Sequence, residues 1–155
     1  MSAHDRRIGG SAVGQMTHLD DLSACAVIYL RLWSDGPEGQ AAVWNDLARG
    51  LGAARGRAAL ATFETLVGLL GQHGRRPLMR HAATCACLGA DEACFANFIA
   101  TATTGEREDA LLMAMLLVRP DVAPQLCAVD MDFGIALKQM LLRSGPVMQA
   151  NGPLH

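Results

Sequence analysis

The stretch that decides the fold is ALLMAMLLV, residues 110–118, the longest uninterrupted apolar run in the chain. A run of nine residues is about half of what a helix needs to cross a bilayer, so it predicts a helix inside a protein rather than a membrane span. A helix that is apolar on every side is normally enclosed by other elements. We therefore expect residues 110–118 to be the buried central helix of the molecule.

The composition predicts helical surroundings for this segment. The chain has 155 residues, of which 51% are hydrophobic and only 5% aromatic, so its core must consist mainly of Ala, Leu, Val and Met. Ala and Leu have the highest helix propensities, and β-branched residues, which favour strands, are scarce. A chain of this length is the size of one ordinary domain.

Apolar side chains at helical spacing, separated by Gly and Pro, set the expected helix boundaries. Among the predicted elements are a short helix over residues 78–88, a second short helix that begins at Pro124, and a last helix that begins near Phe133. The connections are short, which favours antiparallel neighbours. The fold class predicted is all-α, a compact single-domain bundle of seven or eight antiparallel helices around the apolar central helix (110–118).

The ends of the chain carry no helical period. Residues 1–16 are small, polar and rich in Gly, and we expect a disordered N-terminal lead-in there. Residues 17–144 are expected to form the single helical domain, and Gly145-Pro146 to begin a C-terminal tail over residues 145–155. Arg6-Arg7 precede a segment too short and too Gly-rich for an export signal, so we expect a cytoplasmic protein.

Charge gives little reason to expect a nucleic acid or membrane partner. The formal net charge is −2, but its distribution is uneven. Residues 49–81 hold six arginines against a lone Glu64, whereas residues 91–132 hold eight acidic residues against two arginines. Such asymmetry could orient self-association of basic on acidic surfaces, although adjacent helices in one molecule could equally neutralise each other.

A cluster of soft ligands is the most suggestive chemical feature. His81, Cys85, Cys87 and Cys94 lie within fourteen residues, and His81 and Cys85 would share one helix face. Convergence of all four would give a zinc site or an iron–sulfur cluster, and two thiols alone could act as a redox sensor. Their spacing matches no usual zinc pattern, and buried thiols that pack as small hydrophobes are the competing interpretation.

Three guanidinium groups lie at the N-terminus of the predicted helix over residues 78–88. Arg75, Arg76 and Arg80 would surround its N-terminus, where free backbone N–H groups attract anions. A small anionic ligand such as a phosphate or carboxylate could bind there. Alternatively, Arg75 and Arg76 could cap the carbonyls of the preceding helix. No aromatic residue lies among them to stack on a base, so nucleic acid is not expected.

Catalytic motifs are absent from the sequence. It contains neither a Gly-x-Ser-x-Gly elbow nor a His-Glu-x-x-His helix, and Asp130-x-Asp132 is read as a pair of helix caps. The apolar content exceeds what a small helical monomer readily hides. We therefore expect a non-catalytic interaction or regulatory module that forms a homodimer or binds another protein, with the metal or thiol site and the anion site as alternatives.

Overall fold

The chain folds into a mostly helical structure, described for residues 12–144 by a computed structural model. Its elements in chain order are β1 (Ala12–Gln15), the 3-10 helix η1 (Met16–His18), α2 (Asp21–Ser34), α3 (Pro37–Leu51), α4 (Ala53–His73), β2 (Cys87–Gly89), α5 (Ala90–Thr103), α6 (Arg107–Leu117) and α7 (Ala123–Ser144). The helical character agrees with the predicted class. The described part of the chain has six α-helices, fewer than the seven or eight expected.

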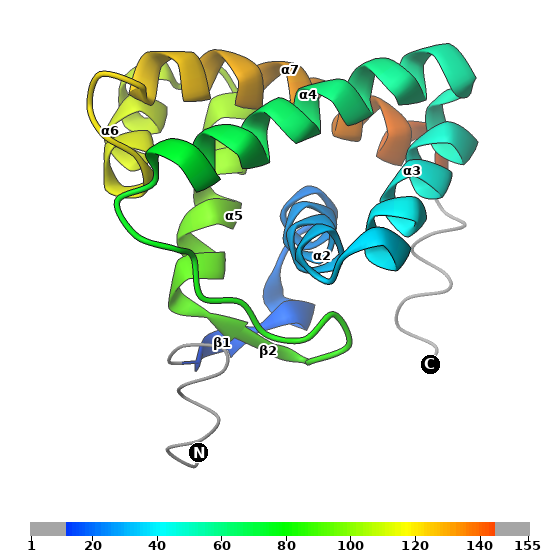
Figure 1. The fold of residues 1–155 in the computed structure, drawn as a ribbon, viewed down its shortest axis with the longest axis horizontal. Coiled ribbons are helices and arrows are strands. Elements are labelled where there is room, and N and C mark those ends of the chain that lie inside the picture. The colour runs from blue at the N-terminus through cyan, green and yellow to red at the C-terminus, as the bar shows by residue number, and fades with distance from the viewer. Residues whose placement is uncertain (1–11, 145–155) are drawn as a thin grey trace.

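Helix α7, not the apolar run, is the centre of the packing, because it contacts each of the other five α-helices. Figure 1 shows α4 and α7 lying along one edge of the molecule, with α2 seen nearly end-on beneath them. Phe63 of α4 and Phe133 of α7 are fully buried, and their ring centroids lie 4.8 Å apart. This aromatic pair and the leucines around it form the main hydrophobic core.

The prediction that residues 110–118 form a buried central helix is wrong. Most of the run belongs to α6, a helix of 11 residues that packs against α5 and α7 through Ala110, Ala114 and Leu117. On its outer side, Leu112 and Leu116 are 62% and 68% exposed. Because the run is apolar all round, its sequence could not show which face is buried.

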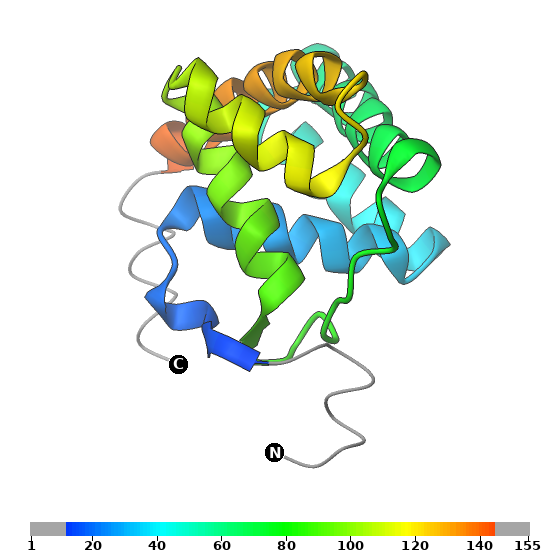
Figure 2. The ribbon, with the colours of Figure 1, turned by 90° about the vertical axis from the view of Figure 1, so that its left-hand side faces the viewer.

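The elements near both ends of the described chain depart from the predicted boundaries. The C-terminal residues expected to form two helices form one, α7, with Pro124 in its first turn. Within the expected lead-in of residues 1–16, residues 12–15 form strand β1, which pairs antiparallel with β2. Figure 2 shows this pair at the end of α5 that lies away from α6 and α7. Residues 1–11 and the predicted tail, 145–155, lie outside the described residues.

The predicted helix over residues 78–88 is also wrong. Residues 75–86 form an irregular loop that leads into β2, hereafter the 75–86 loop. The backbone N–H groups of Met79 and His81 donate to side-chain carboxylates of α5, and the carbonyl of Cys85 accepts from Arg31 of α2. These contacts occupy the polar groups that a helix would use internally.

Other helix boundaries are set by residues close in sequence. Asp20 caps α2 by accepting a 2.8 Å bond from the Ser23 N–H. Gly52 ends α3 and precedes α4 with a φ of 86°, a left-handed conformation that strongly favours glycine. Pro37 opens α3 at its first helical position. Across residues 12–144, no helix has the length and apolar character needed to span a membrane.

Candidate functional site

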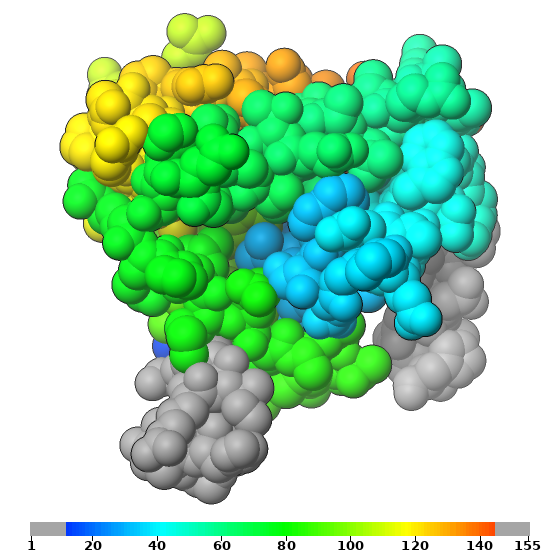
Figure 3. Space-filling view, in the orientation of Figure 1, coloured from blue at the N-terminus to red at the C-terminus, as the bar shows by residue number. Residues whose placement is uncertain are grey.

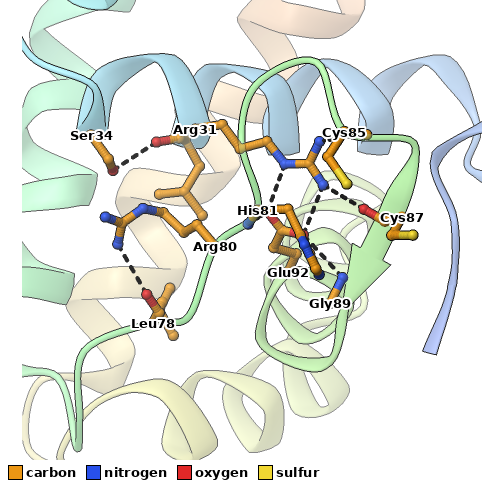
Figure 4. Close-up of polar contacts among 10 residues, drawn as sticks. Arg31, Ser34, Leu78, Arg80, His81, Cys85, Cys87, Gly89 and Glu92 are labelled. Atoms are coloured by element: carbon orange, nitrogen blue, oxygen red, sulfur yellow. Dashed lines mark hydrogen bonds and ion pairs between the residues drawn. The ribbon is translucent and has the colours of Figure 1, made fainter. Parts of the chain in front are cut away.

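A fully buried ion pair joins α2 to α5. Arg31 and Glu92 are 1% and 0% exposed. Two hydrogen bonds join them, Nε to Oε2 at 2.7 Å and Nη2 to Oε1 at 2.9 Å. Charge-assisted bonds of this two-pronged kind are stronger and more directional than neutral ones. The Arg31–Glu92 pair is drawn in Figure 4.

This pair also holds the segment that leads into α5. Arg31 donates to the carbonyls of Cys85 and Cys87 at 2.8 and 2.7 Å. Glu92 accepts from the N–H groups of His81 and Gly89 at 3.1 and 3.0 Å. Burial favours the neutral acid, but the hydrogen bonds from Arg31, Gly89 and His81 outweigh it and hold the pKa of Glu92 below its usual value. Glu92 is therefore a buried carboxylate whose role is to fix this segment.

Its neighbour Asp91 makes a parallel but more exposed arrangement. Both carboxylate oxygens of Asp91 accept from Arg76, and Oδ2 also accepts from the Met79 N–H at 2.6 Å. Burial alone would raise the pKa of Asp91, yet its bonds with Arg76 and Met79 lower it overall. Asp91 and Glu92 thus attach two successive parts of the 75–86 loop to the N-terminus of α5.

The four predicted metal ligands do not form a metal site in the described part of the chain. No group of three or more His, Cys, Asp or Glu residues within residues 12–144 is placed to hold a metal ion. Figure 4 shows that Cys85 and Cys87 contribute backbone carbonyls to the Arg31 guanidinium. The structure therefore gives no support to a zinc or iron–sulfur site at His81, Cys85, Cys87 and Cys94.

Burial in the protein makes some of the cysteine thiols harder to ionise. All five cysteines are free. Burial raises the pKa of Cys25 to about 12, and burial together with the Asp91 charge raises that of Cys94. A raised pKa lowers the thiolate fraction and with it the reactivity toward oxidants. This disfavours Cys94 as a member of a redox-sensing pair.

The predicted anion-binding arginines have separated roles. Arg76 forms an ion pair with Asp91. Arg75 donates through Nε to the Met115 carbonyl, and Arg80 donates through Nη1 to the Leu78 carbonyl. No helix begins here, so the predicted helix N-terminus is absent. All three arginines nevertheless line one groove of about 660 Å³ beside α2 and α4, which we call the cationic groove.

A second hollow lies beside the exposed side of α6. It measures about 420 Å³ and is lined mainly by apolar side chains of α5, α6 and α7, namely Ala102, Arg107, Ala110, Leu111, Pro124, Cys127, Ala128, Met131 and Asp132. Leu112 and Leu116 do not line this α6 pocket; they are exposed one turn apart on another side of α6, and we call these two residues the leucine face.

Asp130 is not the helix cap that the sequence predicted. It lies inside α7, is fully buried, and neither of its carboxylate oxygens has a hydrogen-bond partner within the described residues. Burial raises its pKa from 3.8 to about 8. Asp130 is consequently held as a neutral acid at neutral pH.

Sequence reasoning missed Arg31 and Glu92 as a pair. One signal was present: Ser23, Val27 and Arg31 recur every four residues on one face of α2, so a single cation interrupts a face that is otherwise small or apolar. A buried cation requires a buried anion. The sequence held no signal that the anion would be Glu92, 61 residues away.

Comparison of the chain with protein-family models, with curated proteins and with solved structures finds no match to any of them.

Proposed function

We propose that the protein is a non-catalytic helical interaction module that self-associates by packing α6 against α6 of a second copy. The observation that carries the proposal is the leucine face, since Leu112 and Leu116 are both more than half exposed on one side of α6. Large apolar side chains exposed together on one face are typical of protein–protein contacts.

The charges at the two ends of α6 favour an antiparallel arrangement. A two-fold axis that crosses the contact at the level of Ala114 along α6 would set Leu112 of one copy against Leu116 of the other. The same axis would bring Asp109, in the first turn of α6, toward Arg119, which follows the helix. Opposite charges would then meet at both ends of the contact, and the two helix dipoles would oppose each other.

The size of α6 limits the strength of this contact. Its 11 residues span about 16 Å, so α6 and the adjoining pocket cannot cover the 1,200–2,000 Å² that is typical of stable complexes. We therefore expect a reversible dimer that dissociates on dilution into the micromolar range. Reversible association suits a regulatory module, and five free thiols suit a reducing compartment such as the cytoplasm.

The test is the molar mass in solution across a dilution series, measured by light scattering or sedimentation. The variant Leu112→Glu/Leu116→Glu should remain monomeric where the wild type is dimeric, because paired carboxylates cannot be buried in the contact. The matched control is Leu142→Glu, which alters a leucine that is 72% exposed near the end of α7. A wild type that stays monomeric at high concentration, or a dimer that survives the double substitution, would contradict the proposal.

A further inference from the structure

The cationic groove is hollowed into one face of the molecule between α4, the end of α2 and the 75–86 loop. In Figure 3 it appears as the recess between the α4 surface and the blue surface of α2. Its volume of about 660 Å³ lies within the range of small-molecule sites, which is roughly 300–1,000 Å³. Such sites usually combine apolar walls with a few placed polar groups.

The groove has this combination. Leu30, Val67, Leu70 and Leu78 supply aliphatic walls, and Trp33 adds a half-buried indole. Arg75, Arg76 and Arg80 lie at its rim against a single acidic lining residue, Glu64. The lining therefore offers an apolar surface together with a positive edge.

Two of the three arginines keep donors that nothing in the described chain uses. The Arg75 side chain donates only through Nε and the Arg80 side chain only through Nη1, so the remaining guanidinium N–H groups of both have no partner among residues 12–144. In Figure 4 the Arg80 side chain lies near Ser34 and Leu78, apart from the Arg31–Glu92 pair. Guanidinium groups that already hold one bond are positioned to bind a carboxylate or phosphate with the others.

Two glycines in the wall of the groove have no structural reason to be glycine. Gly68 and Gly71 lie one turn apart inside α4, both line the groove, and a Cβ at either position would meet no atom within 4 Å. At each of the other glycines inside helices, a Cβ would lie under 3.0 Å from a neighbouring atom: Gly39, Gly50, Gly56 and Gly134. Glycine weakens a helix, and one of its recurrent uses is to let a ligand approach the backbone closely.

We propose that the cationic groove binds an amphiphilic organic anion, a carboxylate or phosphate ester with an apolar body. Its charged end pairs with Arg75 and Arg80, and its body lies along Gly68 and Gly71 beside Trp33. Inorganic phosphate alone would leave the aliphatic walls uncovered, and an uncharged apolar molecule would leave the guanidinium groups unused. This site is separate from the leucine face and does not depend on self-association.

The probe is sodium decanoate, titrated into the full chain carrying Trp44→Phe, so that Trp33 is the only tryptophan. Decanoate should change the Trp33 fluorescence with a saturable curve, whereas decyltrimethylammonium and inorganic phosphate should not. Arg75→Gln and Arg80→Gln should each weaken binding by about tenfold, the usual value of one charge-assisted bond. The control is Arg57→Gln, which alters an exposed arginine of α4 that does not line the groove.

The variant Gly68→Ala/Gly71→Ala separates a binding role from a folding role. Alanine favours the helix, so the melting temperature should rise, by about 3 °C for each substitution, while decanoate binding falls. The proposal is overturned by a flat decanoate titration, by equal binding of decyltrimethylammonium, by an equal loss in Arg57→Gln, or by glycine variants that bind decanoate as well as the parent does.

Discussion

Glu92 and Asp130 are both fully buried acids, yet their surroundings differ in one respect. Glu92, at the start of α5, accepts four hydrogen bonds, two of them from Arg31. Asp130, in the middle of α7, accepts none from the described residues. The pKa of Glu92 is lowered and that of Asp130 is raised to about 8, so the partners, rather than the depth of burial, decide which carboxyl group is charged.

The two acids therefore change the stability of the folded state with pH in opposite directions. Glu92 contributes stability above its unfolded pKa near 4.5, and this contribution is lost as the pH falls through its lower folded pKa. Asp130 does the reverse, because the folded state retains its proton to about pH 8 while the unfolded chain releases it near pH 3.8. Between these two values the folded state binds more protons, so stability falls as the pH rises.

The largest effect is expected on breaking the Arg31–Glu92 pair. Arg31→Met leaves Glu92 buried without its cation, and Glu92→Leu leaves Arg31 without its anion. Each should lower the free energy of unfolding by about 3–5 kcal/mol, measured by urea denaturation. The double variant Arg31→Met/Glu92→Leu should cost less than the sum of the two, because neither charge is then left alone. Additive losses would mean that Arg31 and Glu92 act independently. Arg31 would then not be the reason why Glu92, unlike Asp130, is charged.

A smaller effect of opposite sign is expected at Asp130. The Asp130→Asn variant carries no ionisable group there, so the decline of stability between pH 4 and pH 8 should flatten. In the wild type this group alone contributes a slope of up to about 1.4 kcal/mol per pH unit. At pH 7.5 the variant should be more stable by on the order of 2 kcal/mol, with the gain limited because the buried amide also lacks partners. Parallel pH profiles for the two proteins would show that Asp130 is charged or paired in the folded state.

How far the sequence predicts this structure depends on whether the deciding contacts are local. Pro37 as a first helical residue and Gly52 as a break are set by neighbours within a few residues, and they agree with the helix boundaries that Gly and Pro predict. The pairing of β1 with β2 joins Ala12 to Gly89. No local sequence pattern predicts a strand of four residues whose partner is so distant in the chain.

The candidate sites show the same limit. Arg75, Arg76 and Arg80 do line one groove, but for a reason that the sequence did not supply, since the helix expected there is replaced by a loop attached to Asp91 and Glu92. Residues 110–118 were identified as the decisive apolar run, yet their all-round hydrophobicity concealed an exposed leucine face. In both cases the missing information was which neighbour a side chain meets in three dimensions.

The smallest effect is expected at Arg76, which repeats the chemistry of Arg31 at the surface. Both guanidinium groups make two bonds to a carboxylate of α5, and the two carboxylates belong to consecutive residues. Arg76 is 64% exposed, however, so water replaces its bonds when they break, and Asp91 keeps the Met79 N–H. Arg76→Gln should therefore shift the melting temperature by no more than about 2 °C. A loss equal to that of Arg31→Met would show that the number of hydrogen bonds, and not the removal of water, sets the strength of these two pairs.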